Sequence, residues 1–447
     1  MKHGLTDRLH SINVDQIISL GLVIILLTPI WNGAIFSIFD RFGILGKSQM
    51  DTLLFVLETM LMGLAFVMSI KREIRATSLT WGVAVLVVLT EALLFPANIP
   101  AMKEYARGFC LFALPAFCMA YAVNDRGVLL RQLDSTVYPS VAAIVIYGLF
   151  AETRTYSMWY GYAALVPMLM LGMRCIRRNQ AIDYIIFSVL FIMLLLKASR
   201  GSVLTIFMFL VVFLVAYTYR TRNDSAQSLP LFLRAQRYIL FNRRFRFIAL
   251  TVFTIALALI LLQPVAQMLQ SLLEGIGISA RTVNIFANKG IFYLSKREIW
   301  IENLTEAIMT SPLLGLGLCG DSVFMVHNVF HYPSNTYSVD WHYMGNYSHN
   351  MVLELTSHFG ITVGLLFLFL ILLLAMSAFR KAHFSADFDS FDVILVMTTV
   401  LVSLQFSGTY LTSTMFWLFL GLIVKSHAKA YNAKRENSGG SVHYANT

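Results

Sequence analysis

The chain has 447 residues, 57% of them hydrophobic and only 13% charged, with a net charge of +10. A soluble domain usually carries about twice that share of charged residues. Apolar runs of roughly 18 residues or more recur along the whole length, which excludes an ordinary soluble protein and predicts an all-α polytopic membrane protein. Most lysines and arginines lie in short loops between these runs. That pattern is typical of membrane topology, so we expect no nucleic-acid partner.

Taken in chain order, the apolar runs predict about 12 transmembrane helices. The predicted spans cover residues 16–38, 53–70, 79–95, 108–124, 136–150, 157–174, 182–197, 201–218, 247–263, 350–378, 390–407 and 414–425. Loops rich in lysine and arginine alternate along the chain with loops that have few, and both ends of the chain fall on the basic side. The positive-inside rule therefore predicts that both termini are cytoplasmic.

This topology predicts four parts. Residues 1–263 form nine spans with a basic cytoplasmic loop at 220–246, which we expect to lie on anionic membrane lipid. Residues 264–349 form one large loop or subdomain on the outer side, between spans 9 and 10. Residues 350–430 form the last three spans, and residues 431–447 form a disordered cytoplasmic tail. The four cysteines are scattered without a C-x-x-C pair, so we expect neither a disulfide framework nor a metal site.

Two cations on the outer side do not follow from the topology. Lys197 and Arg200 lie in a tight hairpin between two predicted spans. Charges at a membrane boundary are costly unless they are paired or face a polar cavity. The hairpin therefore predicts an anion-binding site at the outer leaflet. The alternative is that both side chains reach phospholipid headgroups.

The large outer loop contributes further cations, namely Arg281, Lys289, Lys296 and Arg297. Arg297 is adjacent to Glu298, and adjacent positions on a helix do not face each other, so this arginine is not committed to that carboxylate. Guanidinium groups bind phosphate through two parallel hydrogen bonds, which makes converging arginines well suited to a diphosphate. The alternative is a run of solvated loop charges.

A histidine marks the point where the polar loop meets the next apolar run. His349, with Asn350 beside it, directly precedes the predicted helix. Because histidine exchanges protons near neutral pH, His349 is a candidate general base or hydrogen-bond donor toward a sugar hydroxyl. Glu354 and His358 are four positions apart, which places them on one helix face, where either could orient the site. The alternative for His349 is a hydrogen-bonded polar residue at the membrane interface.

These residues fall into an ordered set of motifs that resembles the O-antigen polymerase and ligase superfamily. Arg200 to Leu204 resembles its R-x3-L motif at an outer hairpin. Arg297 to Trp300, followed by Ser311 to Gly317, resembles its R-x-x-W and P-L-x-G-x-G stretch. His349 and Asn350, followed by Gly360, resemble its H-N-x9-G element. The second glycine falls at Gly364, one position later than in the family pattern.

The resemblance implies a metal-independent glycosyltransferase of the GT-C type in the bacterial inner membrane, without a cofactor and with its active site on the periplasmic face. Its donor is a glycan on undecaprenyl diphosphate, and its acceptor is another glycan or the lipid A–core. Arg200 and Arg297 would hold the diphosphate, and His349 would contact or activate the acceptor hydroxyl. The predicted substrate-binding residues around them are Lys197, Arg281, Lys296, Asn350 and Glu354. A chain-length regulator and a flippase are compatible protein partners.

Two members of this superfamily share the donor machinery. A polymerase extends O-antigen or capsule repeat units, whereas a ligase transfers the finished glycan to lipopolysaccharide core. The sequences of two motifs, Ser199 to Ser202 and Pro312 to Gly317, resemble those of polymerases more than those of ligases. The run from His327 to Tyr347 is aromatic and polar, and is either a sugar-stacking lid or an ordered interfacial loop.

Two other classes of function are alternatives to an enzyme. A transporter or flippase predicts paired charges within the membrane. An assembly scaffold would give the cations on the outer side no role.

Overall fold

The computed structural model describes residues 13–43, 47–150, 158–178, 180–197, 201–206, 209, 263–275, 281–289, 298–330, 343–384, 404–406 and 408–439. Every regular element in these residues is a helix, and none of them forms a strand. The described part of the chain is therefore all-α, as the apolar runs predict.

The chain divides into two compact units. Unit 1 is formed by Met1–Thr28, Thr52–Leu133 and Lys296–Thr447, and unit 2 by Pro29–Asp51 and Asp134–Ser295. The division falls inside the first long helix, α2 (Val14–Phe42). Unit 2 contains α8 (Val137–Phe150), α9 (Met158–Ala163), α10 (Leu165–Arg178), α11 (Ala181–Lys197) and α15 (Arg281–Asn288).

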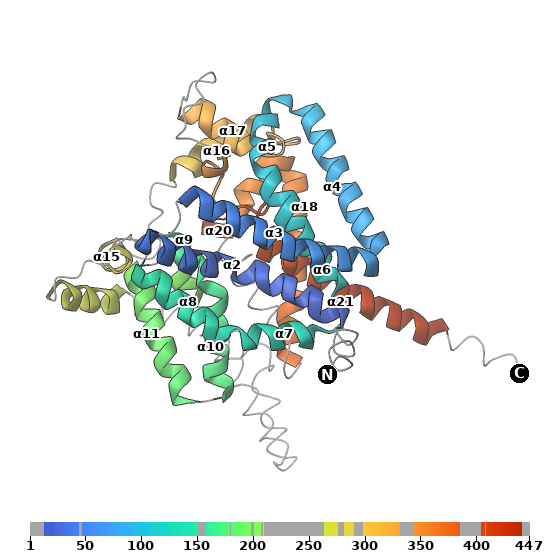
Figure 1. The fold of residues 1–447 in the computed structure, drawn as a ribbon. Helices are drawn as coiled ribbons and strands as arrows, with labels where there is room; N and C mark the ends of the chain where they lie inside the picture. Colours follow the sequence, from blue (N-terminus) through green and yellow to red (C-terminus); the bar gives the residue numbers. More distant parts are fainter. Residues whose placement is uncertain are drawn as a thin grey trace, which may run out of the picture. The chain divides into compact units, whose positions relative to one another are not determined.

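Unit 1 holds most of the remaining helices (Figure 1). Its N-terminal half contains α3 (Lys47–Arg72), α4 (Ile74–Leu94), η1 (Pro96–Asn98), α5 (Ile99–Gly108), the π-helix η2 (Phe109–Ala113), α6 (Leu114–Ala122) and α7 (Arg126–Ser135). Its C-terminal half contains α16 (Glu298–Thr310), α17 (Gly320–Phe324), the π-helix η4 (Met325–Val329), η5 (Tyr343–Gly345), α18 (Met351–Phe384), α20 (Leu404–Phe406) and α21 (Thr414–Gly439).

Five helices are long and apolar enough to cross a membrane: Val14–Phe42, Thr52–Arg72, Ile74–Leu94, Pro96–Ala122 and Met351–Ser377. The bent pair α7 and α8 adds a sixth if it counts as one span. These helices overlap predicted spans, which supports an all-α membrane protein. The predicted spans at 201–218, 247–263 and 390–407 lie mostly outside the described residues, so the total of about 12 stays a prediction.

One span begins earlier than the hydropathy pattern predicts. The fourth apolar run was expected at 108–124, but its helical path begins at Pro96 and passes through η1, α5 and η2 before α6. Helix α5 carries Lys103 and Arg107 on its exposed side, and these charges lower the local hydropathy. Its other side is buried at Tyr105, so an amphipathic helix extends the apolar one.

The core of unit 1 is the packing of α6 against α21. Ala116, Ala120 and Ala122 of α6 are fully buried. A Cβ at Gly421 of α21 would lie 2.4 Å from the Phe117 carbonyl oxygen, so only glycine fits there. Small residues at a contact between membrane helices let the backbones approach closely, and dispersion contacts then hold the pair together.

The outward faces of α3, α4 and the second part of α18 are apolar. Met60, Leu86 and Phe369 are 70%, 65% and 56% exposed, and they have many apolar neighbours along these helices. A soluble monomer rarely exposes so large a continuous apolar surface. Lipid is the solvent that fits these faces, in agreement with the membrane prediction.

The two ends of α4 have different surroundings. At its start, Glu73 pairs with Lys425, and close by Arg72 pairs with Asp15 at 2.5 Å. At its far end, Glu91 accepts a hydrogen bond from the backbone N–H of Leu318 at 2.9 Å. A helix of 21 residues is about 30 Å long. A basic, ion-paired end of unit 1 therefore lies one membrane thickness from the end where α4 contacts the segment before α17 (Figure 1).

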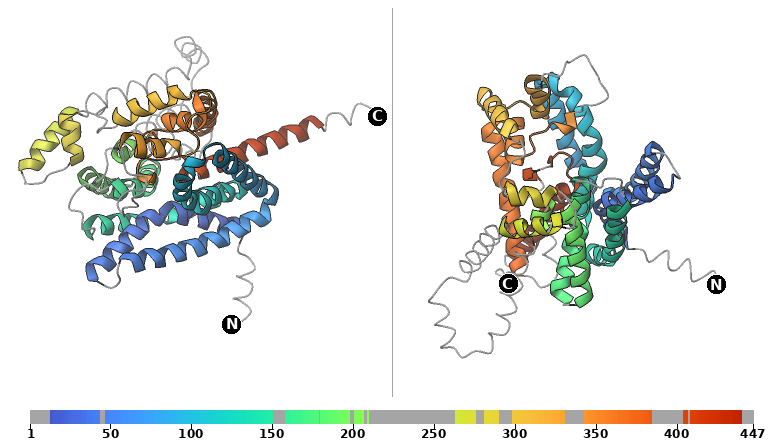
Figure 2. Two further views of the ribbon diagram at one scale, coloured as in Figure 1. Left: turned by 90° about the horizontal axis from the view of Figure 1, so that it is seen from above. Right: turned by 90° about the vertical axis from the view of Figure 1, so that its left-hand side faces the viewer.

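Helix α18 is interrupted at Gly360, whose φ of 75° and ψ of 169° are not helical. The Ile361 N–H donates to the Pro312 carbonyl at 2.7 Å, and the Ser357 carbonyl accepts from the Leu316 N–H at 2.5 Å. In a continuous helix these two groups of α18 would bond each other. The loop after α16 therefore replaces one intrahelical bond by two bonds of its own. Figure 2 shows α18 in orange from two further directions.

The break predicts a strict requirement for glycine. A Cβ at Gly360 would lie 2.2 Å from the Leu313 carbonyl oxygen, and its positive φ adds strain of roughly 1–3 kcal/mol. We expect Gly360→Ala to lower the free energy of unfolding by more than that strain, measured by thermal unfolding in detergent. Gly82→Ala is the control, because a Cβ on α4 meets nothing within 4 Å. Equal stability of the two variants would contradict the role given to the break.

Candidate functional site

The site begins with a glycine-rich turn, Ser311–Gly317, that lies against the break in α18. Gly315 and Gly317 have φ values of 71° and 81°, which favour glycine. A Cβ at Gly315 would lie 2.5 Å from the Ser357 carbonyl oxygen, and one at Gly317 would meet the Phe95 ring at 2.3 Å. The motif that the sequence analysis identified here therefore has a packing reason for both of its glycines.

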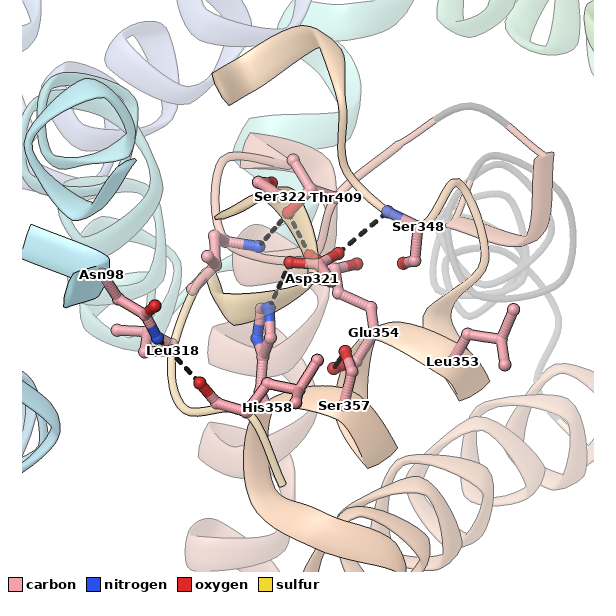
Figure 3. A network of polar contacts seen from close by, with 12 residues as sticks. Asn98, Leu318, Asp321, Ser322, Ser348, Leu353, Glu354, Ser357, His358 and Thr409 are labelled. Carbon is pink, nitrogen blue, oxygen red and sulfur yellow. Dashed lines mark hydrogen bonds and ion pairs between the residues drawn. The ribbon is translucent and has the colours of Figure 1, made fainter. Parts of the chain in front are cut away.

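Two side chains from the N-terminal half of unit 1 fasten this turn. The Asn98 amide donates to the Leu316 carbonyl at 2.8 Å (Figure 3), and Glu91 accepts from the Leu318 N–H at 2.9 Å. Asn98 is buried, and Glu91 lies one turn from the end of α4. The turn is thereby held between α18 on one side and the end of α4 on the other.

The turn leads directly into a buried polar network centred on Asp321. One Asp321 oxygen lies 2.9 Å from His358 Nε2, and the other accepts from the Ser348 N–H at 2.8 Å (Figure 3). His358 Nδ1 lies 2.9 Å from the Tyr410 hydroxyl. Asp321 and His358 are each 1% exposed. Because an ionised carboxylate can only accept, His358 Nε2 carries a proton and donates a hydrogen bond to Asp321.

The electrostatic state of Asp321 follows from these contacts. Burial alone would raise the pKa of Asp321, but the positive charge and hydrogen bond of His358 outweigh it. The backbone N–H groups of Ser348 and Ser322 lower the pKa further, so that it falls below its ordinary value of 3.8. Asp321 is therefore ionised at neutral pH, although it is buried.

Glu354 and His358 share one face of α18, as their spacing predicts. Glu354 is 1% exposed, and its carboxylate accepts from the Thr409 hydroxyl and, at 3.3 Å, from the Tyr410 N–H. The first turns of α18 are thus joined to the segment before α21. Glu354 contacts protein groups here, and its predicted role in substrate binding stays a prediction.

His349 itself has an unusual backbone. Its φ is 54°, and Cys319 is the only other described residue besides glycine with a positive φ. Its ring lies 4.2 Å from the ring of Tyr347 and 5.6 Å from that of Trp300, between ring centroids. Trp300 also contacts Phe330 at 5.4 Å. Non-glycine residues at positive φ often mark functional positions, because the surrounding structure must hold them there.

Asn350 caps α18. Its side-chain oxygen accepts from the Val352 N–H at 2.9 Å and from the Leu353 N–H at 3.2 Å. These N–H groups have no partner within the helix, so the cap stabilises the first turn. Asn350 was predicted to bind substrate. The structure gives it a structural role, and its role toward substrate stays a prediction.

Aromatic hydroxyls support the other side of the network. The Tyr105 hydroxyl on α5 lies 3.0 Å from the Ser322 hydroxyl and donates to the Tyr343 carbonyl at 3.4 Å. The Tyr343 hydroxyl lies 3.1 Å from His327 Nε2. The described ends of the run from His327 to Tyr347 are therefore ordered against the core of unit 1. Residues 331–342 of that run lie outside the described residues.

The predicted cations cannot all be compared with the structure. Lys197 is the last residue of α11 and Arg281 the first of α15, and these two helices pack against each other in unit 2. Arg200, Lys296 and Arg297 lie outside the described residues. Lys197 and Arg281 belong to unit 2 and His349 to unit 1, so the convergence of the cations on His349 stays a prediction.

The sequence analysis missed Asp321 and Tyr410. Asp321 is 37 positions from His358 and 27 from Ser348, so no local pattern connects them. One signal was available, since an acidic residue follows the glycine-rich turn Ser311–Gly317 by only four positions. Within the described residues, no group of three His, Cys, Asp or Glu side chains is placed to hold a metal ion.

An apolar cavity of about 620 Å³ adjoins the network. Its walls come from α4, α5, α18 and α21, and they include Ala84, Phe359 and Trp417. Cys319 and Tyr410 line it as well, so it reaches the residues around Asp321. Burial raises the pKa of the Cys319 thiol, with the charge of Asp321 adding to the shift, so this thiol is neutral and inert.

No protein-family model matches the sequence, and no curated protein or solved structure does either.

The state of Asp321 predicts an acid-sensitive contribution to stability. Its folded pKa lies below 3.8, so its hydrogen bonds stabilise the fold fully above that value and are lost as the pH falls through the folded pKa. At pH 7 we expect Asp321→Asn to cost about 1.5–3 kcal/mol. Thermal unfolding in detergent between pH 7 and pH 3 should show the native chain and the variant converging in acid. A difference that does not change with pH would contradict an ionised Asp321.

Proposed function

We propose that the chain is a periplasm-facing glycosyltransferase that takes its donor glycan from undecaprenyl diphosphate. In this proposal it polymerises O-antigen or capsule repeat units in the bacterial inner membrane. The alternative acceptor is the lipid A–core, which would make it an O-antigen ligase. The observation that carries the proposal is His349, held in a left-handed conformation between aromatic rings at one end of a membrane-embedded unit.

The sidedness of the site supports this proposal. Arg72, Arg126 and Lys425 gather at the ion-paired end of unit 1, where Arg126 donates to the Leu422 carbonyl. The positive-inside rule assigns such an end to the cytoplasm. Glu91 and Asn98 reach the glycine-rich turn at the opposite end. His349 then faces the periplasm, where lipid-linked repeat units are joined.

The chemistry suits a histidine in this place. The acceptor hydroxyl gives its proton to His349 while its oxygen bonds to the anomeric carbon of the donor. The bond between that carbon and the phosphate oxygen breaks, and the electron pair leaves with the diphosphate. Tyr347 and Trp300 offer ring faces on which the acceptor sugar can lie. The Trp300 N–H is buried and has no hydrogen-bond partner in the described part of the chain, which leaves an unused donor beside His349.

The leaving diphosphate needs positive charge, and we assign that role to Arg200 and Arg297 with Lys197, Arg281 and Lys296 near them. Arg297 precedes Trp300 by three positions in the sequence, and Trp300 contacts His349. Helices α11 and α15, which carry Lys197 and Arg281, pack against each other in unit 2, and the proposal takes these two cations as a second group. A guanidinium cluster of this kind stabilises a phosphate leaving group without a metal ion.

The apolar cavity supports a lipid carrier. It opens among helices whose outer faces are apolar, and its walls reach Cys319 and Tyr410 beside the network. A prenyl chain fits a cavity lined almost wholly by hydrocarbon. In this arrangement the chain lies along α4 and α18, and the diphosphate is presented at the outer end of unit 1.

A transporter or flippase is the second candidate, and one observation favours it. Helix α18 is interrupted at Gly360, and Glu354 and His358 are buried just before the break. Many secondary transporters form their binding sites from interrupted helices with buried ionisable residues. In this chain the hydrogen bonds of both residues go to protein groups. A transporter would move substrate across liposomes without forming a glycosidic bond, which separates the two candidates.

The central prediction concerns His349. We expect His349→Ala to lower the rate of glycan transfer by about 10²–10⁴-fold, because a positioned base contributes that much. Arg200→Ala and Arg297→Ala should abolish transfer through loss of the diphosphate contacts. The measurement is product length on a gel with purified enzyme and lipid-linked donor. His427→Ala is the matched control, since His427 is exposed on α21 and contacts Ser377. Full activity of His349→Ala would remove the base from the scheme.

A deletion strain distinguishes the two acceptors. Core that carries a single repeat unit indicates a polymerase, and core without repeat units indicates a ligase. A normal lipopolysaccharide ladder with lost capsule assigns the enzyme to capsule synthesis. A normal ladder with normal capsule would contradict the proposed function.

The cavity yields a separate prediction about the donor. Ala84→Trp would fill part of the cavity and should raise the KM for the prenyl-linked donor by about 10-fold, equivalent to roughly two buried CH2 groups. A donor with a short lipid should be less affected. Val85→Trp is the control, because Val85 is 50% exposed and does not line the cavity. Equal effects of both substitutions would contradict a donor chain in this cavity.

A further inference from the structure

The left-handed conformation of His349 has to be held by its neighbours. A residue other than glycine loses roughly 1–2 kcal/mol in this region because its Cβ crowds the backbone. The residue after His349 is fixed, because Asn350 caps α18 through Val352 and Leu353. The residue before it, Ser348, is 3% exposed and has its N–H directed at Asp321. Two side-chain acceptors therefore hold the chain on either side of His349.

Asp321 can hold the Ser348 backbone in place because several neighbours fix the position of its own carboxylate. It lies on α17, directly after the glycine-rich turn that is fastened to the break in α18. His358 holds its other oxygen (Figure 3), and the Tyr410 hydroxyl holds His358. Three separate segments of unit 1 therefore fix one carboxylate, which can then fix the Ser348 backbone. Supporting hydrogen bonds of this kind can fix the backbone that carries a reacting side chain.

Burial excludes a direct role for Asp321 in the reaction. With 1% of its surface exposed, Asp321 cannot contact a sugar or a diphosphate. His358 is equally buried, so it cannot pass a proton to the acceptor side. Both residues can act only through the groups that they hold. The Ser348 N–H links the network to the residue directly before His349.

We propose that Asp321 is a positioning residue that keeps His349 in its left-handed conformation through the hydrogen bond from Ser348, with His358 and Tyr410 fixing the carboxylate. The proposal rests on the proposed function for the role of His349 in transfer. It adds that the left-handed conformation of His349 depends on an accepting oxygen at position 321, and that the charge of that side chain is not required.

This distinction defines the pair of variants. Asp321→Asn keeps one accepting oxygen, and the fixed Ser348 N–H requires that oxygen to face it. The amide nitrogen then faces His358, whose neutral ring can accept at Nε2 and donate from Nδ1 to Tyr410. Asp321→Ala removes the acceptor altogether. We expect Asp321→Asn to keep most of the activity. We expect Asp321→Ala to lower kcat by about 100-fold, as a displaced catalytic group does, with little change in the KM for the donor.

The double variant separates positioning from general destabilisation. If Asp321 acts through His349, Asp321→Ala combined with His349→Ala should be no less active than His349→Ala alone. A further loss in the double variant would mean that Asp321 acts elsewhere, and would overturn the proposal. A folded Asp321→Asn that is as inactive as His349→Ala would also overturn it, because charge would then be what matters. That second test stands even if Asp321→Ala does not fold.

A second measurement does not depend on activity. Diethyl pyrocarbonate labels histidine rings, and peptide mass spectrometry reports each site separately. We expect Asp321→Ala to increase labelling of His349 severalfold, as its ring leaves Tyr347 and Trp300, and to leave His327 unchanged. Unchanged His349 labelling overturns this proposal and leaves the proposed function standing. Full transfer activity of His349→Ala would instead contradict the proposed function, because His349 would not be the base. The labelling result would then still decide whether Asp321 positions His349.

Discussion

The exchange of hydrogen bonds at Gly360 is the interaction on which the rest of unit 1 depends. Breaking a helix frees a carbonyl and an N–H, and a buried backbone group without a partner costs about 1–3 kcal/mol. Here Ser357 and Ile361 find their partners in the loop after α16. The loop can approach that closely only because Gly315 and Gly360 lack side chains. The break and the turn therefore stabilise each other, and neither would persist alone.

The contact between the loop after α16 and the break in α18 also positions the elements around His349. The turn places α17 beside the first part of α18, so Asp321 meets His358. The segment before α21 then closes the network through Thr409 and Tyr410, which bond Glu354 and His358. A buried polar cluster of this kind is stable only when each group has its partner. Within the described residues, the clustered carboxylates and imidazole meet that condition.

Sequence reasoning found the helices and part of the site for reasons that can be identified. Apolar runs and a histidine at a helix start are local patterns, so α4, α18 and His349 were predictable. The glycines were found as a motif, and the delayed Gly364 counted as a departure. In the structure a Cβ at Gly364 would lie 2.6 Å from the Leu355 carbonyl, so this glycine belongs to the break as well. Asp321 was missed because its partners are far away in sequence.

The hydrogen bonds of Asp321 also bear on how a site that contains a buried carboxylate could bind the diphosphate of the proposed donor. A buried carboxylate near a diphosphate would repel it, and a low dielectric strengthens that repulsion. Asp321 directs its two oxygens toward His358 and the Ser348 N–H, which offset its charge locally. In the proposed function, the cations assigned to the diphosphate, Arg297 among them, then supply the charge that the substrate meets. An acidic side chain can therefore hold the backbone of a site that must attract an anion, provided that its charge is neutralised within the protein.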